Sequence, residues 1–219
     1  MELDLFIRYG PALLRGFGVT LLCWLAGSIG GMVLGFVIAS IYQFSGRWVR
    51  LVLQTYIEIL RGTPFMIQLF ILYYGGPHFG LLLTPVQAGI IGFVLYGSPY
   101  FAEIFRAGFQ STPRGQYEAA HCFGFTEWTI VRRVVLPQML VSITAPLTNF
   151  FIILTKETAI LSVVTVPELL FETQTMAAET FTYVEPFLAL SLFYWFMVEV
   201  TSWLGKRVER HVTRHLRRA

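Results

Sequence analysis

The sequence predicts an all-α membrane protein with five transmembrane helices, and three observations lead to that fold class. Of the 219 residues, 55% are hydrophobic. Only 13% are charged, about half the fraction in a soluble domain. Five apolar stretches approach the roughly 20 residues that cross about 30 Å of hydrocarbon as a helix. We place them at 17–42, 52–75, 85–107, 138–162 and 184–205. Strands are disfavoured, because an open sheet leaves unpaired backbone groups in lipid.

These stretches leave room for a single domain. An outer segment at 1–16 is expected to precede a membrane domain at 17–208, and a basic tail follows at 209–219. The first apolar run has no small-residue cleavage site after a short core, so we interpret it as a retained span rather than a signal peptide. Cys23 and Cys122 do not suggest a disulfide framework.

Basic residues in the short loops predict the orientation. Two arginines lie between the first and second spans, at Arg47 and Arg50. Four lie between the third and fourth spans, at Arg106, Arg114, Arg132 and Arg133. The tail joins them, whereas 157–185 carries five glutamates and no base. Because short cytosolic loops are enriched in Lys and Arg, we expect the N-terminus outside and the C-terminus in the cytosol. Arg8 and Arg15 run against this rule.

The long loop at 108–137 is predicted to lie in the cytosol as two short helices. Thr112 can cap the first, with a proline at its opening position. Gly124 can stop that helix in a left-handed conformation. Thr126 then begins a second helix, which is expected to end before Pro137.

A spaced motif runs through this loop. Glu118-Ala119-Ala120 is followed by three residues, Gly124, nine residues, Val134, one residue, and Leu136-Pro137. The pattern resembles the signature loop of ABC importer permeases, with valine in the place of isoleucine. The resemblance implies a coupling helix seated in a groove of a separate cytosolic ATPase. An ordinary amphipathic surface helix with a glycine stop is the alternative. The residues expected to couple are Gly115, Glu118, Ala119, Ala120, Gly124, Leu136 and Pro137.

Other segments resemble the polar amino acid branch of these permeases. They are Arg61 to Pro64, Tyr100 to Arg106, Gly115 to Ala120, Leu136 to Gln138, and Lys156 to Thr158. The resemblance covers about 19–208 and implies the type I importer fold in a bacterial inner membrane. It also implies four kinds of partner: a second permease subunit, the same or homologous; two ABC ATPase subunits; a periplasmic or surface-anchored solute-binding protein; and a polar amino acid. Nucleic acid is not expected as a partner.

We expect no catalytic residue and no bound cofactor in this chain. It contains no Gly-x-x-x-x-Gly-Lys-Ser/Thr phosphate loop, so ATP and Mg are expected on the partner ATPase. His211 and His215 lie four apart in the tail, but no third ligand is near in the sequence, and a solvated tail is favoured over a metal site.

The second span holds the first candidates for the substrate path, since ionisable groups inside spans are costly and so are functional candidates. Glu58 and Arg61 lie three apart, on one helical face. Pro64 removes a backbone donor, so the carbonyl of Leu60 loses its usual helical partner and can be used by a polar ligand, water or a neighbouring side chain. An internal Glu58–Arg61 pair beside a structural proline kink is an equal alternative. Two further candidates for the path in this span are Thr63 and Gln68.

Polar residues in the third and fourth spans complete the candidate path. Glu103 and Arg106 are three apart, and form either a gate or an interfacial salt bridge. A polar cluster interrupts the fourth span, at Asn149, Thr155, Lys156, Glu157 and Thr158. It either contacts substrate or joins helices by hydrogen bonds, with the lysine reaching the outer interface.

The outer segment at 167–181 carries three glutamates beside apolar residues, and is expected to form a short amphipathic helix. It either docks a binding protein or lies among lipid headgroups.

Two other classes of protein compete with an ATP-driven importer. A secondary amino acid transporter or channel subunit would use the intramembrane charges without ATP, and the loop motif argues against it. An intramembrane enzyme would need a catalytic dyad or a metal cluster, and the sequence contains no credible arrangement of either kind. Which amino acid is carried, and whether the permease pairs with itself, stay open.

Overall fold

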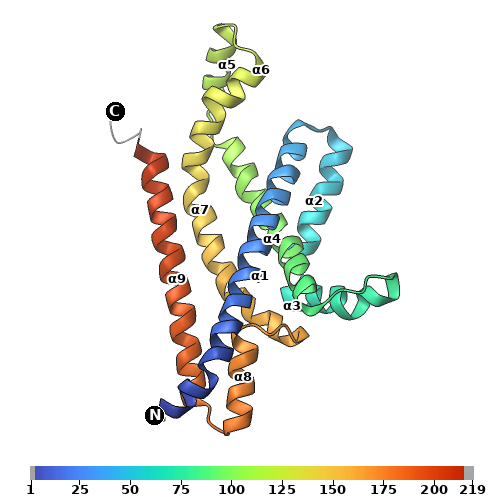
Figure 1. The fold of residues 1–219 in the computed structure, drawn as a ribbon. Helices are drawn as coiled ribbons and strands as arrows, with labels where there is room; N and C mark the ends of the chain where they lie inside the picture. Colours follow the sequence, from blue (N-terminus) through green and yellow to red (C-terminus); the bar gives the residue numbers. More distant parts are fainter. Residues whose placement is uncertain (1–2, 215–219) are drawn as a thin grey trace.

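The structure, a computed structural model, describes residues 3–214, with side chains from Ile7 onward. The regular secondary structure in this range is helical, and no strand occurs among these residues (Figure 1). Four helical runs in the range are long and apolar enough to cross a membrane: Ile7–Phe44, Pro85–Gln110, Glu127–Val164 and Val184–Val212. The all-α fold class is therefore confirmed, but one of the five predicted spans is not a single helix.

The first helix, α1 (Leu3–Phe44), begins well before the span predicted at 17–42. Its first turns pack against α8 (Leu169–Thr180), where Leu13 meets Leu169 and Met176 in a small core. The described part of the predicted outer segment is thus helical and continuous with the span. Residues 1–2 lie outside the described range.

The centre of the fold is the contact between α1 and α4 (Pro85–Gln110). Glycines on α1 allow the two backbones to approach closely, as small residues do in membrane helices. A Cβ on Gly27 would lie 2.3 Å from the Cβ of Phe93, and one on Gly35 would lie 2.7 Å from the carbonyl oxygen of Ser98. Phe93 is fully buried in this contact.

The segment predicted as a helix over 52–75 is broken. It forms α2 (Arg47–Arg61), α3 (Phe65–Phe70), a π-helical turn at Ile71–Gly75 and a 3₁₀ turn at Gly76–Phe79. The predicted disturbance at Pro64 is larger than a kink, because this residue adopts an extended conformation, with φ −62° and ψ 140°. Proline supplies no amide to the preceding turn, so the chain changes direction at the break.

The loop helices are α5 (Arg114–Cys122) and α6 (Glu127–Ile130). From α6 the chain stays helical through a π turn at Val131–Val135 into α7 (Leu136–Glu157), followed by a 3₁₀ segment at Thr158–Val164. The prediction that a helix ends before Pro137 is therefore wrong. Pro137 lies in the first turn of α7, and the wider π turn before it accommodates a residue that donates no hydrogen bond.

The last helix, α9 (Val184–Val212), runs antiparallel to α7 (Figure 1). A Cβ on Gly205 would lie 2.0 Å from Cγ2 of Thr148, so the two helices touch there. The first part of the predicted tail at 209–219 belongs to α9, which ends at Val212. Thr213 and Arg214 continue in a 3₁₀ conformation. The remainder, including His215, lies outside the described range.

Candidate functional site

The loop motif forms a helix that projects from the bundle. α5 and α6 lie at the opposite end of the molecule from α8 (Figure 1). Glu118 and Ala119 on α5 are exposed, whereas Ala120 is buried. Gly124 follows with φ +74°, which confirms the predicted left-handed stop. Thr126 Oγ1 accepts a hydrogen bond from the Thr129 amide at 3.4 Å, which confirms the predicted start of the second helix.

Thr112 does not cap α5, contrary to the prediction. The helix begins one residue later than expected, so Pro113 takes the N-cap position and has no side-chain acceptor to offer. Thr112 is 6% exposed. Its Oγ1 has no hydrogen-bond partner among the described residues. The predicted cap is instead a buried hydroxyl beside the start of the helix.

Hydrogen bonds fasten α5 to the base of α7. The Gln138 amide nitrogen donates to Oε1 of Gln116 on α5, and to the Val134 carbonyl at 2.9 Å. At the other end of α5, His121 Nε2 lies 3.3 Å from Oε1 of Glu127 on α6. α5 is thus joined directly to α7 at one end and to α6 at the other.

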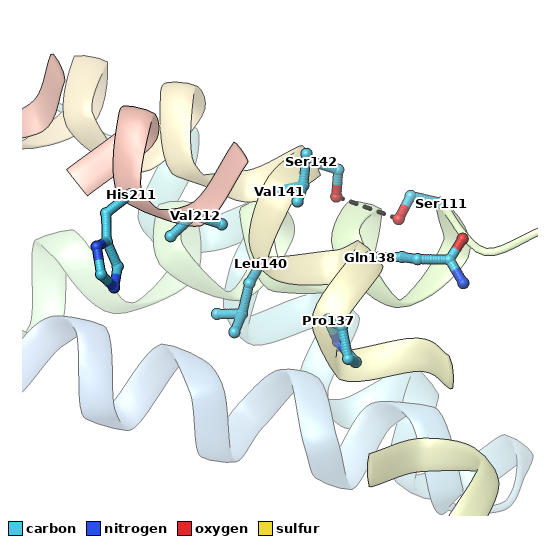
Figure 2. A pocket seen from close by; sticks show the side chains of 8 residues that line it. All are labelled: Ser111, Pro137, Gln138, Leu140, Val141, Ser142, His211 and Val212. Carbon is cyan, nitrogen blue, oxygen red and sulfur yellow. Dashed lines mark hydrogen bonds between the residues drawn. The ribbon is translucent and has the colours of Figure 1, made fainter. Parts of the chain in front are cut away.

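A cavity of about 530 Å³ separates the first turns of α7 from the last turn of α9. Figure 2 shows Pro137 and Leu140 on α7 and His211 on α9 among its lining residues. Ser142 Oγ donates to Ser111 Oγ at 3.1 Å, and so joins α7 to the end of α4. Near α5, the two long helices are thus not tightly packed on one another.

The break between α2 and α3 is closed by one side chain. The Gln68 amide nitrogen donates to the Leu60 carbonyl at 2.7 Å, to the Thr63 carbonyl at 3.1 Å and to Thr63 Oγ1 at 2.9 Å. Of the three predicted users of the Leu60 carbonyl, the structure shows a neighbouring side chain, because Gln68 folds back to reach it. Oε1 of Gln68 is buried, with no partner among the described residues.

The charges of the second and third predicted spans meet across helices. Arg61 ends α2 with Nη1 3.9 Å from Oε2 of Glu103 on α4, and its guanidinium carbon lies 5.3 Å from the centre of the Tyr100 ring. Glu103 also accepts two bonds from Arg106, at 2.9 and 2.6 Å, so the predicted pairing of Glu103 and Arg106 is confirmed.

An internal pair between Glu58 and Arg61 is not formed. Glu58 instead accepts a bond from Gln54 at 2.8 Å. Arg61 instead approaches α4, where Glu103 also pairs with Arg106. The side chains at the end of α2 remain exposed, namely Glu58, Arg61, Thr63 and Pro64.

The polar cluster of the fourth span is divided between two faces. Thr155 and Thr158 are buried and donate to the carbonyls of Ile152 and Thr155, both at 2.7 Å. Asn149 and Lys156 are exposed. Glu157 is half-buried.

One face of α7 is uncovered. α7 packs against α9 and α4, while Ala145, Asn149, Ile153 and Lys156 are exposed along it. Their spacing of four, four and three places them in one stripe. The threonines thus have a packing role, and two members of the cluster mark a face available to a ligand or another chain.

The outer helix α8 forms as expected, but its first glutamate is buried. Glu168 is fully buried at the N-cap, where it accepts bonds from the Phe171 amide at 2.8 Å and from Thr20 Oγ1 at 3.3 Å. Burial raises the pKa of this carboxyl to about 7. Glu179, at the other end, is exposed and accepts a bond from the Tyr9 hydroxyl at 2.6 Å.

Sequence reasoning did not find several of these contacts. The Gln116–Gln138 bond joins the motif segments Gly115 to Ala120 and Leu136 to Gln138, and the only signal in the sequence is that each segment contains an amide side chain. The stacking of Arg61 on Tyr100 and the burial of Glu168 depend on the packing of distant segments, for which the sequence gives no periodic signal. Among the described residues, no group of three or more His, Cys, Asp or Glu side chains is placed to hold a metal ion.

Residues 31–214 match the family described as binding-protein-dependent transport system inner membrane component. The chain is 33% identical over 198 residues to a probable amino-acid ABC transporter permease protein, YckA of Bacillus subtilis, with 90% of this chain and 88% of that protein covered. It is 31% identical to the arginine transport system permease protein ArtQ of the same organism, over 91% of this chain and 92% of that one.

Two solved structures have the same fold. A crystal structure of an amino acid ABC transporter with histidines superposes with a TM-score of 0.89 at 33% identity, covering 96% of this chain and 99% of that chain. An inward-facing MetNI methionine ABC transporter superposes with a TM-score of 0.82 at 20% identity, covering 97% of this chain and 100% of that chain.

Proposed function

The chain belongs to the family of binding-protein-dependent transport system inner membrane components, and from this premise we propose that it carries a polar amino acid across a bacterial inner membrane. It is the permease subunit of an amino-acid ABC importer. That function takes the place of the alternative, a secondary transporter or channel without ATP. The observation that supports coupling to a partner is α5, which projects from the bundle with Glu118 and Ala119 exposed.

We propose five membrane crossings, of which the second is the interrupted segment of α2 and α3. The N-terminus and α8 are then outside, and α5, α6 and the end of α9 are in the cytosol. The arginines of the loops between spans support this orientation.

The energy for transport comes from ATP hydrolysis on partner subunits. Two ABC ATPase subunits bind and hydrolyse ATP with Mg, and one of them receives α5 through the surface that includes Gly115, Glu118 and Ala119. ATP-driven closure of the ATPases moves α5. The hydrogen bond of Gln116 to Gln138 carries this motion into α7.

The substrate path is proposed to lie between two sets of polar groups, one at the end of α2 and one along α7. Its residues are Glu58, Arg61, Thr63, Asn149, Lys156 and Glu157. A second permease subunit, the same chain or a homologue, would close the path by covering the exposed stripe of α7. Gln68, Thr155 and Thr158 support the path as packing residues, because their hydrogen bonds are made within the chain. A solute-binding protein delivers the amino acid at the outer face.

Uptake into proteoliposomes that contain the complete importer tests this function. Labelled arginine, glutamine, histidine and glutamate are offered with binding protein outside and ATP inside, and each is competed with unlabelled amino acids. We expect uptake of at least one that requires hydrolysable ATP. Uptake that a proton or sodium gradient drives without ATP would contradict the proposal.

A further inference from the structure

A polar cavity of about 480 Å³ lies beside the start of α5, between the corner joining α1 to α2 and the turn from α4 into α5. Its lining includes two arginines, Arg50 and Arg114, and two amides, Gln43 and Gln110. No acidic residue is among its lining residues. Within residues 3–214, neither arginine takes part in an ion pair. The cavity therefore has an excess of positive charge and hydrogen-bond donors.

Thr112 lines the same cavity with an unused hydroxyl. The side chain is 6% exposed, and its Oγ1 has no hydrogen-bond partner among the described residues. A buried hydroxyl without a partner costs free energy, so such a group calls for an explanation. The hydroxyl oxygen is covered by protein, so a ligand in the cavity that accepts a hydrogen bond would satisfy it once the side chain turns towards the cavity.

The N-terminus of α5 also meets the cavity at Arg114. The helix has nine residues, and its N-cap, Pro113, makes no side-chain capping bond. The first amides of a helix have no partners inside it and carry a partial positive charge. An anion beside them would be stabilised.

Two backbone carbonyls fix the orientation of the Arg50 guanidinium. Its Nε donates to the Tyr42 carbonyl at 3.0 Å and its Nη2 donates to the Gln43 carbonyl at 3.1 Å. A guanidinium has five N–H donors, so about three remain for a ligand. The two backbone bonds fix the plane of the side chain before any ligand arrives, which lowers the entropy cost of binding.

We propose that this cavity binds a phosphoryl group. A tetrahedral oxyanion offers several acceptors in different directions, and these match a fixed arginine fork, a second arginine, a free hydroxyl and a helix N-terminus. Two sources share this chemistry: the headgroup of an anionic phospholipid and free phosphate. Occupancy would tie the α1–α2 corner to α5, and so would link the ligand to the segment that couples to the ATPase.

Binding to the complete importer, purified and stripped of lipid, tests the proposal. One arm counts retained dioleoylphosphatidylglycerol against dioleoylphosphatidylcholine by native mass spectrometry. The other measures radiolabelled inorganic phosphate on importer held in phosphatidylcholine nanodiscs. The variants are Thr112→Val, which removes a hydroxyl with no hydrogen bond in the structure, and Arg114→Gln. The control is Arg132→Gln, an exposed base of the same loop that does not line the cavity.

We expect one ligand per permease chain in at least one arm, weakened about tenfold by each cavity variant and unchanged by the control. Binding of phosphatidylglycerol alone identifies a lipid site, and binding of phosphate alone identifies a site for the free ion. The proposal is overturned if neither probe binds more tightly to the parent than to Thr112→Val. It is also overturned if Arg132→Gln weakens binding as much as Arg114→Gln. Melting temperatures of the variants confirm that they are folded.

Discussion

Gln68 restores the hydrogen bonding that the break between α2 and α3 removes. A leucine at this position keeps the volume but leaves the carbonyls of Leu60 and Thr63 without the donor they now share. We expect Gln68→Leu to destabilise the permease by about 1 kcal/mol, because the part-buried carbonyl of Leu60 would lose its donor. Thermal unfolding in detergent measures this, with Gln54→Leu as the control, since Gln54 is exposed. Equal melting of the two variants would refute a structural role for Gln68.

Glu168 makes stability depend on pH. Burial raises the pKa of this carboxyl from 4.5 to about 7. Between these values the folded chain keeps a proton that the unfolded chain releases, so stability decreases as pH rises through this window and levels off above it. The midpoint temperature of thermal unfolding should therefore decrease as the pH is raised from 4.5 to about 7. Glu168→Gln should remove this part of the slope, and an unchanged slope in that variant would contradict the assignment.

Individual residues show where sequence reasoning was sufficient. The left-handed Gly124 and the Thr126 cap were predictable because each depends on a few neighbouring residues. The partner of Arg61 was not predictable, since Glu103 is 42 positions away and reaches it through the packing of α2 on α4. Thr112 failed as a cap through a one-residue shift of a helix start, which local propensity does not resolve.

At the scale of elements, the contact between α7 and α9 depends on Gly205. An alanine Cβ there would meet Thr148 at three atoms, the nearest at 2.0 Å and the Cβ at 2.9 Å, so rotation of the threonine alone does not relieve the overlap. We expect Gly205→Ala to destabilise the chain by about 1–3 kcal/mol. Gly18→Ala is the matched control, because nothing lies within 4 Å of its added methyl, and alanine favours a helix. A melting temperature for Gly205→Ala equal to that of the control would show that α9 is not held by this contact.

Two elements differ from their predictions, and a proline is involved in both. Over 52–75 the sequence shows Pro64 and polar residues around it, but it does not show that the chain becomes extended there or that Gln68 supplies the missing donor. Around Pro137 the reverse happens, since proline signals an end and the helix continues through a π turn. Composition over a window predicts which segments are helical. It does not predict how a helix absorbs a missing hydrogen bond.

At the scale of the whole molecule, the two native cysteines report the proposed orientation. Cys122 is exposed at the end of α5 and Cys23 is buried. In cells expressing the permease without its ATPase, a membrane-impermeant maleimide should label Cys122 in inside-out vesicles and leave it unlabelled in spheroplasts. Cys122→Ser should abolish the labelling. Efficient labelling in spheroplasts would place α5 outside and reverse the orientation.

The central claim is that α5 transmits the energy of a partner ATPase to this chain. Substrate-stimulated ATP hydrolysis by the reconstituted importer tests it most directly, with Glu118→Lys compared with Glu209→Lys. Both positions are exposed, but Glu209 lies on α9 and outside the loop that carries α5. We predict that Glu118→Lys reduces stimulated hydrolysis at least tenfold while membrane insertion stays normal, because a reversed charge at a docked helix costs several kcal/mol. Glu209→Lys should hydrolyse ATP like the parent. Normal stimulated hydrolysis in Glu118→Lys would contradict the account.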